Sequence, residues 1–244
     1  MRKVEVFDLG QAPYQPVWEL QKQIQQRLID EKLKQRDEPD YQPGSNDVLL
    51  FVEHPHVYTL GKSGNRKHLL KNLAELKQID AEFIPNDRGG DITYHGPGQI
   101  VGYPILNLDR YFTDIHKYLR LLEETIIRVC SEFGLNAGRV EGLTGVWTEG
   151  KKICAMGIRC SRWVTMHGFA LNVNTDLNYF NHIIPCGIHN KSVTSLSEMT
   201  GKYINEQKVK DMILNHFSDL FDAEIITGAE LPESDSQFSY LMPS

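Results

Sequence analysis

The sequence predicts a fold of the α+β class, with a mixed α/β arrangement of helices and strands. Segments with the alternating pattern of strands cluster in the middle of the chain, and helical patterns interrupt them at irregular intervals. Such a pattern lacks the regular β-α-β alternation that predicts an all-parallel sheet. The 244 residues contain no clear linker, so we expect a single domain over residues 1–244.

The first part of the chain predicts a strand, a helix and two further strands. Residues Val4–Leu9 alternate like a strand, and the apolar residues between Val17 and Leu33 recur at helical spacing. The polar stretch at residues 35–47 is predicted to be a surface loop. Short apolar runs at residues 48–54 and 56–61 predict two further strands.

The central part predicts a hairpin and a helix. Residues Arg88–Pro104 read RGGDITYHGPGQIVGYP, and two alternating segments flank Gly96-Pro97-Gly98, which predicts a β-hairpin with a three-residue turn. An apolar stripe then predicts a helix from Ile115 to Phe133, with Thr113 or Asp114 as its N-cap.

The last part predicts three strands and one more helix. The strands lie at residues 145–149, 151–161 and 164–174, and the helix covers Glu206–Phe221. Residues 228–244 are polar and acidic, and we expect them to form a loose C-terminal tail.

Composition limits the classes of function. The formal net charge of −6 argues against a nucleic-acid-binding protein, which needs a basic surface to contact phosphates. The four cysteines have no C-x-x-C spacing, which argues against a zinc site, and they fit free thiols in a reducing cytosol. The N-terminus carries no signal-peptide pattern and no apolar run is long enough for a membrane span, so a cytoplasmic location is expected.

Three stretches contain candidate functional residues. Arg88 and His95 lie among glycines that would let the backbone approach a ligand closely, although the same glycines are ordinary turn residues. Lys152 stands at the start of an apolar strand, where burial of its charge is costly, or else belongs to the turn at Gly150 and lies in water. Cys186, between a proline and a glycine, is either a reactive thiol on a turn or a small buried apolar residue.

Taken together, these stretches resemble the lipoyl(octanoyl) transferase family. The segments RGGDITYHGPGQ, KKICAMGIR, HGFALNVNTDL and IIPCGI occur in the family's order, and the resemblance runs from about Val52 to Cys186. It implies a fold similar to that of biotin protein ligases and lipoate ligases, a mixed sheet flanked by helices. It also implies an octanoyltransferase that acts in the first step of protein lipoylation.

The resemblance further implies the substrates and partners. The octanoyl donor would be acyl carrier protein. The acceptor would be a lysine on the lipoyl domain of a 2-oxoacid dehydrogenase subunit, or on the glycine cleavage H protein. No cofactor or metal is implied, because the donor is already a thioester, and a monomer is expected.

The resemblance assigns roles to individual residues. Cys186 would carry the acyl group as a thioester, and Lys152 would lower the pKa of that thiol and act as a base, with His95 as an alternative base. The substrate-binding residues implied are Arg88, Gly89, Gly90, Asp91, Ile92, Thr93, Tyr94, His95, Ala155, Met156, Gly157, Gly168, Phe169 and Ala170.

Two further sets of residues extend this hypothesis. The walls of an apolar slot for the acyl chain could include Tyr94, Met156, Phe169 and Leu171, which are equally consistent with ordinary core positions. A basic rim for the acidic carrier protein could include Lys62, Arg66, Lys67, Arg159 and Arg162, which are equally consistent with scattered solvated charges. Two other functions stay open: an ATP-dependent lipoate or octanoate ligase of the same fold, and a non-catalytic acyl-binding protein.

Overall fold

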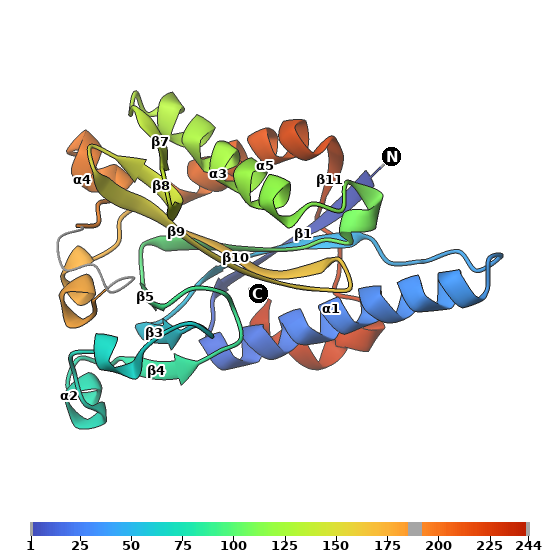
Figure 1. Ribbon diagram of the computed structural model, residues 1–244, viewed down its shortest axis with the longest axis horizontal. Helices are drawn as coiled ribbons and strands as arrows, with labels where there is room; N and C mark the ends of the chain where they lie inside the picture. Colours follow the sequence, from blue (N-terminus) through green and yellow to red (C-terminus); the bar gives the residue numbers. More distant parts are fainter. Residues whose placement is uncertain (1, 185–191, 243–244) are drawn as a thin grey trace.

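The computed structural model describes residues 2–184 and 192–242, and is built around an eight-stranded mixed sheet (Figure 1). The strand order is β11-β1-β2-β6-β10-β9-β8-β7, with parallel pairing of β1 to β2 and β11 and antiparallel pairing elsewhere. The strands are β1 (Arg2–Gln11), β2 (Asp47–Glu53), β6 (Gln99–Ile105), β7 (Ala137–Val140), β8 (Leu143–Thr148), β9 (Lys151–Ser161), β10 (Val164–Asn172) and β11 (Ala223–Thr227).

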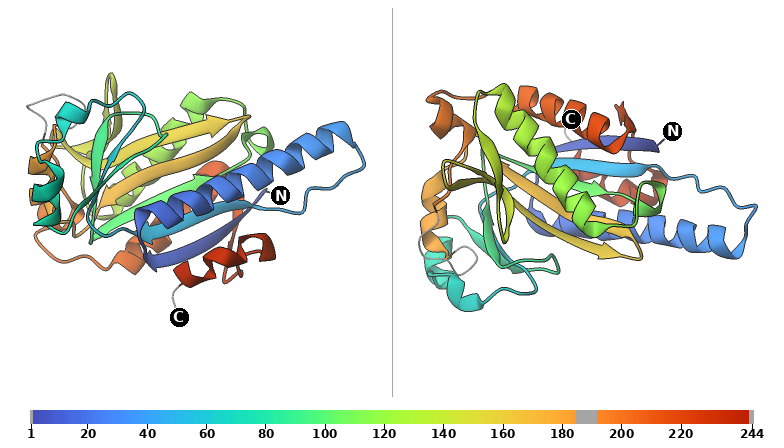
Figure 2. Two further views of the ribbon diagram at one scale, coloured as in Figure 1. Left: turned by 90° about the horizontal axis from the view of Figure 1, so that it is seen from below. Right: turned by 45° about the horizontal axis from the view of Figure 1, so that its top comes forward.

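Helices cover both faces of this sheet, which confirms the predicted α+β class (Figures 1 and 2). Helices α3 (Ile115–Glu132) and α5 (Glu206–Phe221) pack on one face, over a core that includes Ile126, Phe169 and Phe217. Helix α1 (Tyr14–Asp37) packs on the other face, where its apolar stripe is fully buried. The short helix α4 (Leu196–Thr200) lies beyond the end of the sheet at which β9 begins.

Helix α1 is longer than the sequence pattern predicted. It continues to Asp37, so the connecting loop before β2 is limited to residues 38–46 rather than beginning at residue 35. The added turn is rich in Lys, Gln and Arg, which are good helix formers, and Pro39 then prevents further extension.

The prediction of a β-hairpin at residues 88–104 is wrong. Strand β5 (Ile92–His95) pairs with β3 (Val57–Leu60), which also pairs with β4 (Glu82–Pro85), and these three strands form a separate small sheet. Strand β6, the other half of the predicted hairpin, is already paired on both sides, with β2 and β10. The turn at residues 96–98 therefore carries the chain from one sheet to the other.

The remaining predicted elements are confirmed with small shifts of their ends. Strands β8, β9 and β10 and helix α5 lie where the periodicity placed them. Of the two candidate caps of α3, Asp114 is the one used, because its side chain accepts a hydrogen bond of 2.9 Å from the backbone N–H of Lys117. Two short elements, the 3-10 turn at Arg66–His68 and helix α2 (Leu73–Lys77), complete the small sheet's surroundings.

The C-terminal segment differs from the expected loose tail. A 3-10 helix at Glu233–Leu241 packs against α1, with Phe238 and Leu241 only 8% and 5% exposed. The buried carboxylate of Asp235 forms an ion pair with Arg27 of α1. The segment is polar on average, but it contains two apolar residues, Phe238 and Leu241, that are spaced so that both pack on α1.

None of the helices in the described ranges combines the length and the apolarity that a bilayer span requires.

Candidate functional site

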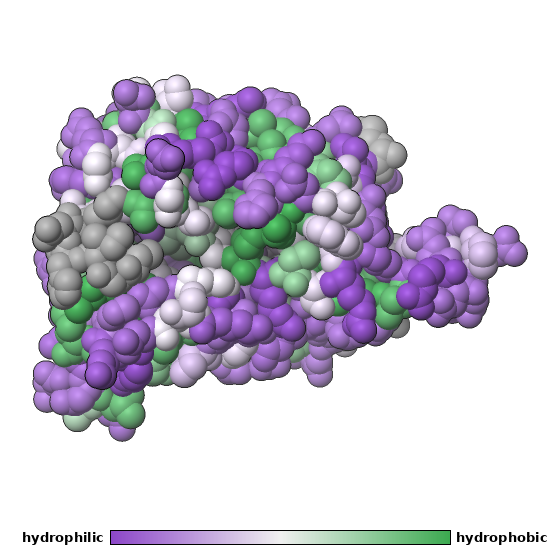
Figure 3. All heavy atoms as spheres, viewed as in Figure 1, coloured by the Kyte–Doolittle hydropathy of each residue, from purple (hydrophilic) through white to green (hydrophobic). Residues whose placement is uncertain are grey.

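A cavity of about 380 Å³ lies against the middle of β9 and β10, under the loop that connects β4 to β5. Apolar surface is visible along the lower edge of α3, where β9 and β10 run (Figure 3). The apolar part of the wall comprises Ile92, Val101, Leu119, Leu143, Ala155, Met156, Ile158, Phe169, Ala170, Phe180 and Val193. The polar part of the wall includes Tyr14, Arg88, His95, Tyr103, Lys152, His167 and Asn172.

The structure brings nearly all of the residues predicted from the sequence to this cavity. Thirteen of the fourteen predicted substrate-binding residues line it, and Lys152 lines it as well. Tyr94 is the exception. Its side chain is completely buried away from the cavity, its hydroxyl group lies 2.7 Å from His56 Nδ1, and its ring packs on Tyr179 and Phe180.

Two of the predicted wall residues are absent from the cavity because their side chains are packed in the cores of the protein. Thr93 and His95 line the cavity, whereas Tyr94 between them belongs to the core of the small sheet. Leu171 likewise lies between the cavity residues Ala170 and Asn172, and its side chain is part of the core under α3.

Glycines let the cavity wall form where the backbone segments approach one another. Gly157 and Gly168 face each other across β9 and β10. A Cβ atom on Gly168 would lie 2.2 Å from the carbonyl oxygen of Gly102, and one on Gly157 would lie 2.9 Å from that of Gly89. The backbone N–H of Gly89 donates to the carbonyl of Ile158 at 2.9 Å, which holds the glycine-rich loop on the edge of β9.

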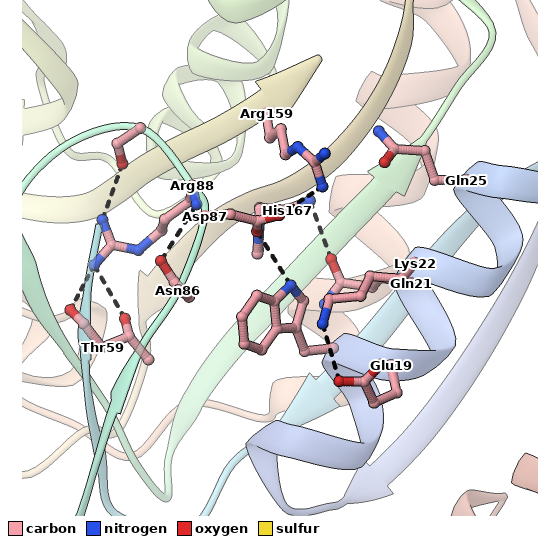
Figure 4. A network of polar contacts seen from close by, with 12 residues as sticks. Glu19, Gln21, Lys22, Gln25, Thr59, Asn86, Asp87, Arg88, Arg159 and His167 are labelled. Atoms are coloured by element: carbon pink, nitrogen blue, oxygen red, sulfur yellow. Dashed lines mark hydrogen bonds and ion pairs between the residues drawn. The ribbon is translucent and has the colours of Figure 1, made fainter. Parts of the chain in front are cut away.

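Arg88 fixes this loop to the small sheet. Its guanidinium group donates to the carbonyl and hydroxyl oxygens of Thr59, at 2.7 and 3.0 Å, and to the carbonyl of Gly89 at 3.0 Å (Figure 4). The side chain is 8% exposed, so these charge-assisted bonds replace water in a nearly dry position.

Lys152 belongs to β9 and lines the cavity, which decides between the two interpretations of the lysine pair. Its Nζ atom lies 4.8 Å from the centroid of the Trp147 ring, a cation–π distance. Lys151, by contrast, points away and forms an ion pair of 3.1 Å with Glu198. The backbone of Lys152 accepts from the N–H of Thr194 and donates to the carbonyl of Ser192, each at 3.0 Å.

Cys186 lies outside the described residues, but the chain on both sides of its segment is anchored beside the cavity. Upstream, Ile183 forms a bridge with Leu69, and the N–H of Ile184 donates to the carbonyl of His68 at 2.8 Å. Downstream, residues Ser192–Thr194 run along Lys152, as described above. The upstream side is therefore held at His68, whose side chain contacts the cavity residue Asp91, and the downstream side is held at the backbone of Lys152.

Several polar residues of the wall were not predicted. His167, on β10, is held by Asp87, whose carboxylate lies 2.8 Å from His167 Nε2 and also accepts from Arg159 at 2.5 Å and Trp18 at 3.2 Å (Figure 4). Burial by itself would raise the pKa of Asp87, but these cationic and hydrogen-bonding neighbours hold it below its usual range. Tyr103 lies on β6 within the stretch Arg88–Pro104, whereas Tyr14 comes from α1, and no local sequence signal relates Tyr14 to the motifs.

The five residues of the predicted basic rim do not form one surface. Lys62, Arg66 and Lys67 are exposed together after β3. Arg159 is instead paired with Asp87, and Arg162 lies in the turn after β9, at the opposite end of that strand from Lys152. Among residues 2–184 and 192–242, no group of three His, Cys, Asp or Glu side chains is arranged to hold a metal ion.

Comparison of the fold with solved structures finds lipoate protein ligases among the chains of similar architecture. The structure of Ta0514, a putative lipoate protein ligase from T. acidophilum with bound lipoic acid, matches with a TM-score of 0.73 at 15% identity over 98% of this chain and 93% of that chain. A lipoate-protein ligase A bound with ATP matches with a TM-score of 0.70 at 15% identity, over 98% and 93% of the two chains. At such identities the likeness shows the shared fold, and it confirms the predicted mixed sheet flanked by helices.

Sequence comparison is more specific. Octanoyltransferase from Flavobacterium johnsoniae is 57% identical over 231 residues, which cover 92% of this chain and 99% of that protein. Octanoyltransferase from Christiangramia forsetii is also 57% identical, over 92% of this chain and 98% of that protein. The family model of the lipoyl protein ligase A/B catalytic domain matches residues 13–218, and the chain belongs to this family.

Proposed function

We propose that this protein transfers an octanoyl group from acyl carrier protein to a lysine of a lipoyl domain, with Cys186 as the acyl carrier. The observation that carries the proposal is the cavity itself, which is mostly apolar and holds Lys152 in its wall, and the backbone of this lysine binds Ser192 and Thr194, which follow the segment that contains Cys186. The octanoyltransferases that are 57% identical over nearly their whole length support the same activity.

The apolar wall suits a saturated acyl chain. Burial of one methylene group contributes about 0.8 kcal/mol, so the seven carbons beyond the carbonyl can supply roughly 5 kcal/mol of binding free energy. Met156, Phe169 and Ala170 supply contact along one side of the cavity, and Ile92 supplies contact from the small sheet.

Lys152 has the properties needed to activate the thiol. The thiolate is the nucleophile that attacks a thioester, and a free cysteine with a pKa of about 8.5 is only slightly ionised at neutral pH. Proton transfer from a cysteine to a lysine of pKa about 10.4 is favourable by roughly 2.6 kcal/mol before burial is considered, because the two reference values differ by about 1.9 units. Loss of water around both charges opposes this gain, and the Trp147 ring offsets part of that loss.

The reaction then proceeds in two acyl-transfer steps. The thiolate of Cys186 attacks the acyl carbonyl carbon of the donor, the donor's carbon–sulfur bond breaks, and the carrier leaves as a thiol after it takes a proton from Lys152. The ε-amino group of the acceptor lysine next attacks the thioester on Cys186, and an amide forms while the cysteine thiol is released. The donor is already activated, so neither ATP nor a metal is needed.

The proposed donor has a candidate docking surface on the loop after β3. Acyl carrier protein is acidic, and the exposed cluster of Lys62, Arg66 and Lys67 offers a complementary charge. The acceptors we propose are lipoyl domains of 2-oxoacid dehydrogenase subunits and the glycine cleavage H protein.

Intact-mass measurement tests the proposal. The protein mixed with octanoyl-acyl carrier protein is expected to gain one octanoyl group that hydroxylamine removes and that does not form on Cys186→Ala. Cys130→Ala is the matched control, because Cys130 is completely buried in the core and burial raises the pKa of its thiol to about 12. An unmodified wild-type protein would reject the covalent mechanism, and octanoylation that requires ATP and free octanoate would favour a ligase instead.

A further inference from the structure

His95 lines the cavity at the end of β5 and is almost completely enclosed. Its ring stacks on Tyr14, with centroids 5.9 Å apart, and meets the edge of His54 at 5.8 Å. Burial lowers the pKa of His95 well below its usual range, and the neighbouring His54, Arg88 and His167 lower it further, against the opposite effect of the Gln99 hydrogen bond. The imidazole is therefore neutral at physiological pH, and one of its two nitrogens carries a hydrogen.

A chain of buried amides determines which nitrogen that is. The carbonyl oxygen of Thr194 can only accept, so the group 3.0 Å from it is the NH₂ of Asn172. The oxygen of Asn172 then accepts from the NH₂ of Gln99 at 2.9 Å, and this NH₂ also donates to the carbonyl of Tyr94 at 3.2 Å. Two backbone carbonyls thus fix the orientation of both amides.

The orientation of Gln99 leaves its oxygen facing His95. Gln99 Oε1 lies 2.8 Å from His95 Nδ1, and two acceptors cannot form a hydrogen bond with each other. Nδ1 must carry the hydrogen, so Nε2 is the unprotonated nitrogen with a lone pair. No described residue forms a hydrogen bond with Nε2.

The same chain ties His95 to the wall that holds Lys152. Thr194, which accepts from Asn172, donates its own N–H to the carbonyl of Lys152 at 3.0 Å. Asn172 and Gln99 are also register partners across β10 and β6. His95, Asn172 and Lys152 all line one cavity.

We propose that His95 Nε2 accepts the N–H of the acceptor lysine in the second half-reaction, and that Gln99 and Asn172 are positioning residues that keep this nitrogen unprotonated. The inference rests on the proposed function. It assigns His95 to the attacking amine and not to the oxyanion, because a nitrogen without a hydrogen cannot donate to an oxyanion.

The low basicity of His95 determines when the proton moves. A buried imidazole cannot take a proton from a free lysine ammonium group, whose pKa is about 10.4, so the amine enters the cavity in its neutral form. As the carbon–nitrogen bond forms, the nitrogen becomes acidic and its proton passes to Nε2. The carbon–sulfur bond then breaks, the electron pair stays on the sulfur of Cys186, and that thiolate takes the proton from His95.

The test separates the two half-reactions in Gln99→Met, which keeps the approximate size of the side chain and removes its three hydrogen bonds, to His95, Asn172 and the carbonyl of Tyr94. Gln25→Met is the matched control, because Gln25 is also a buried amide but donates to the carbonyl of Val164 on the far side of β10 from α3. Acylation by octanoyl-acyl carrier protein is measured by intact mass, and transfer from the preformed octanoyl-enzyme to a lipoyl domain is measured in a single turnover.

For Gln99→Met we expect transfer to slow by at least about tenfold, less than the roughly 100- to 10,000-fold of a whole general base because His95 is retained, with acylation nearly unchanged. Gln25→Met should leave both steps unchanged. Equal slowing of both steps in Gln99→Met, or unchanged transfer, would overturn the inference.

A direct measurement covers the case in which Gln99→Met does not fold. Long-range proton–nitrogen NMR spectra of the wild-type protein with ¹⁵N-labelled histidine should show His95 with its hydrogen on Nδ1. A hydrogen on Nε2 would refute the inference whatever the kinetics. Failure of the wild-type protein to form an octanoyl adduct would instead reject the proposed function, while the spectrum would still report the tautomer.

Discussion

The substitution Ala155→Leu on β9 should reduce the space in the cavity that is available to the acyl chain. Ala155 lines the cavity, is only partly exposed, and lies beside Cys154, whose side chain points the other way into the core. Leucine adds three carbons at this position, and they would occupy space that the acyl chain otherwise fills. At about 0.8 kcal/mol for each methylene displaced, octanoyl binding should weaken by roughly 2.4 kcal/mol, or about 60-fold.

The assay compares the rate of enzyme acylation by carrier protein loaded with butanoyl, hexanoyl and octanoyl groups. The octanoyl rate should fall most and the butanoyl rate least, which shifts the preference toward short chains. Ala74→Leu is the control, because Ala74 is exposed on α2 and lies outside the cavity. A uniform decrease for all three chain lengths would refute the assignment of Ala155 to the chain-binding wall.

Three other predictions concern stability and pH. Gly168→Ala should destabilise the fold by about 1–3 kcal/mol in chemical denaturation, because the new Cβ would overlap the carbonyl oxygen of Gly102, whereas Gly138→Ala, with open space around it, should have little effect. Phe238→Ala should cost about 3 kcal/mol of unfolding free energy if the C-terminal segment packs on α1 as described, and a change below about 0.5 kcal/mol would restore the expectation of a loose tail. Burial lowers the pKa of His54 to about 4, so the neutral form is favoured in the folded state and the unfolded state takes up a proton first. The stability that depends on neutral His54 should therefore be complete above pH 6.5 and should fall by about 3 kcal/mol as the pH decreases to 4. The slope of unfolding free energy against pH should be shallower in His54→Gln, and an unchanged slope would contradict this attribution.

Much of the fold could be predicted because its local signals are strong. The apolar stripe of α3, the pattern of α5 and the three strands β8 to β10 were located from periodicity alone. The hairpin at residues 88–104 was predicted wrongly because sheet pairing is not a local property: the partners of β6, in β2 and β10, lie 49 or more residues away in sequence. The prediction of a loose C-terminal tail failed for a related reason, since Phe238 and Leu241 become buried only through their contact with α1, which is distant in sequence.

The residues of the candidate site likewise fall into those that the sequence predicts and those that it does not. Its motif residues could be listed from the sequence because they are consecutive, but the structure shows that the side chains of Tyr94 and Leu171 pack in the cores and not in the wall. The positions of Tyr14 and of the Asp87–His167 pair could not be predicted, because each depends on contacts between residues far apart in the sequence. Lys152 was ambiguous in the sequence, and its pairing with Ser192–Thr194 on one side of β9 resolved that ambiguity.

The fold itself does not decide between thioester transfer and ATP-dependent ligation. Lipoate protein ligases share the architecture at about 15% identity, so the large sheet and its cavity are compatible with either chemistry. Under the proposed function the two chemistries differ in one requirement, because thioester transfer needs a nucleophile and ATP-dependent ligation does not. The chain supplies Cys186 in a segment whose two ends are fixed to His68–Leu69 and to the backbone of Lys152. Because the Lys152 contacts are made by backbone groups, a Cys186 variant should keep the cavity and still bind the acyl chain while it loses the covalent step.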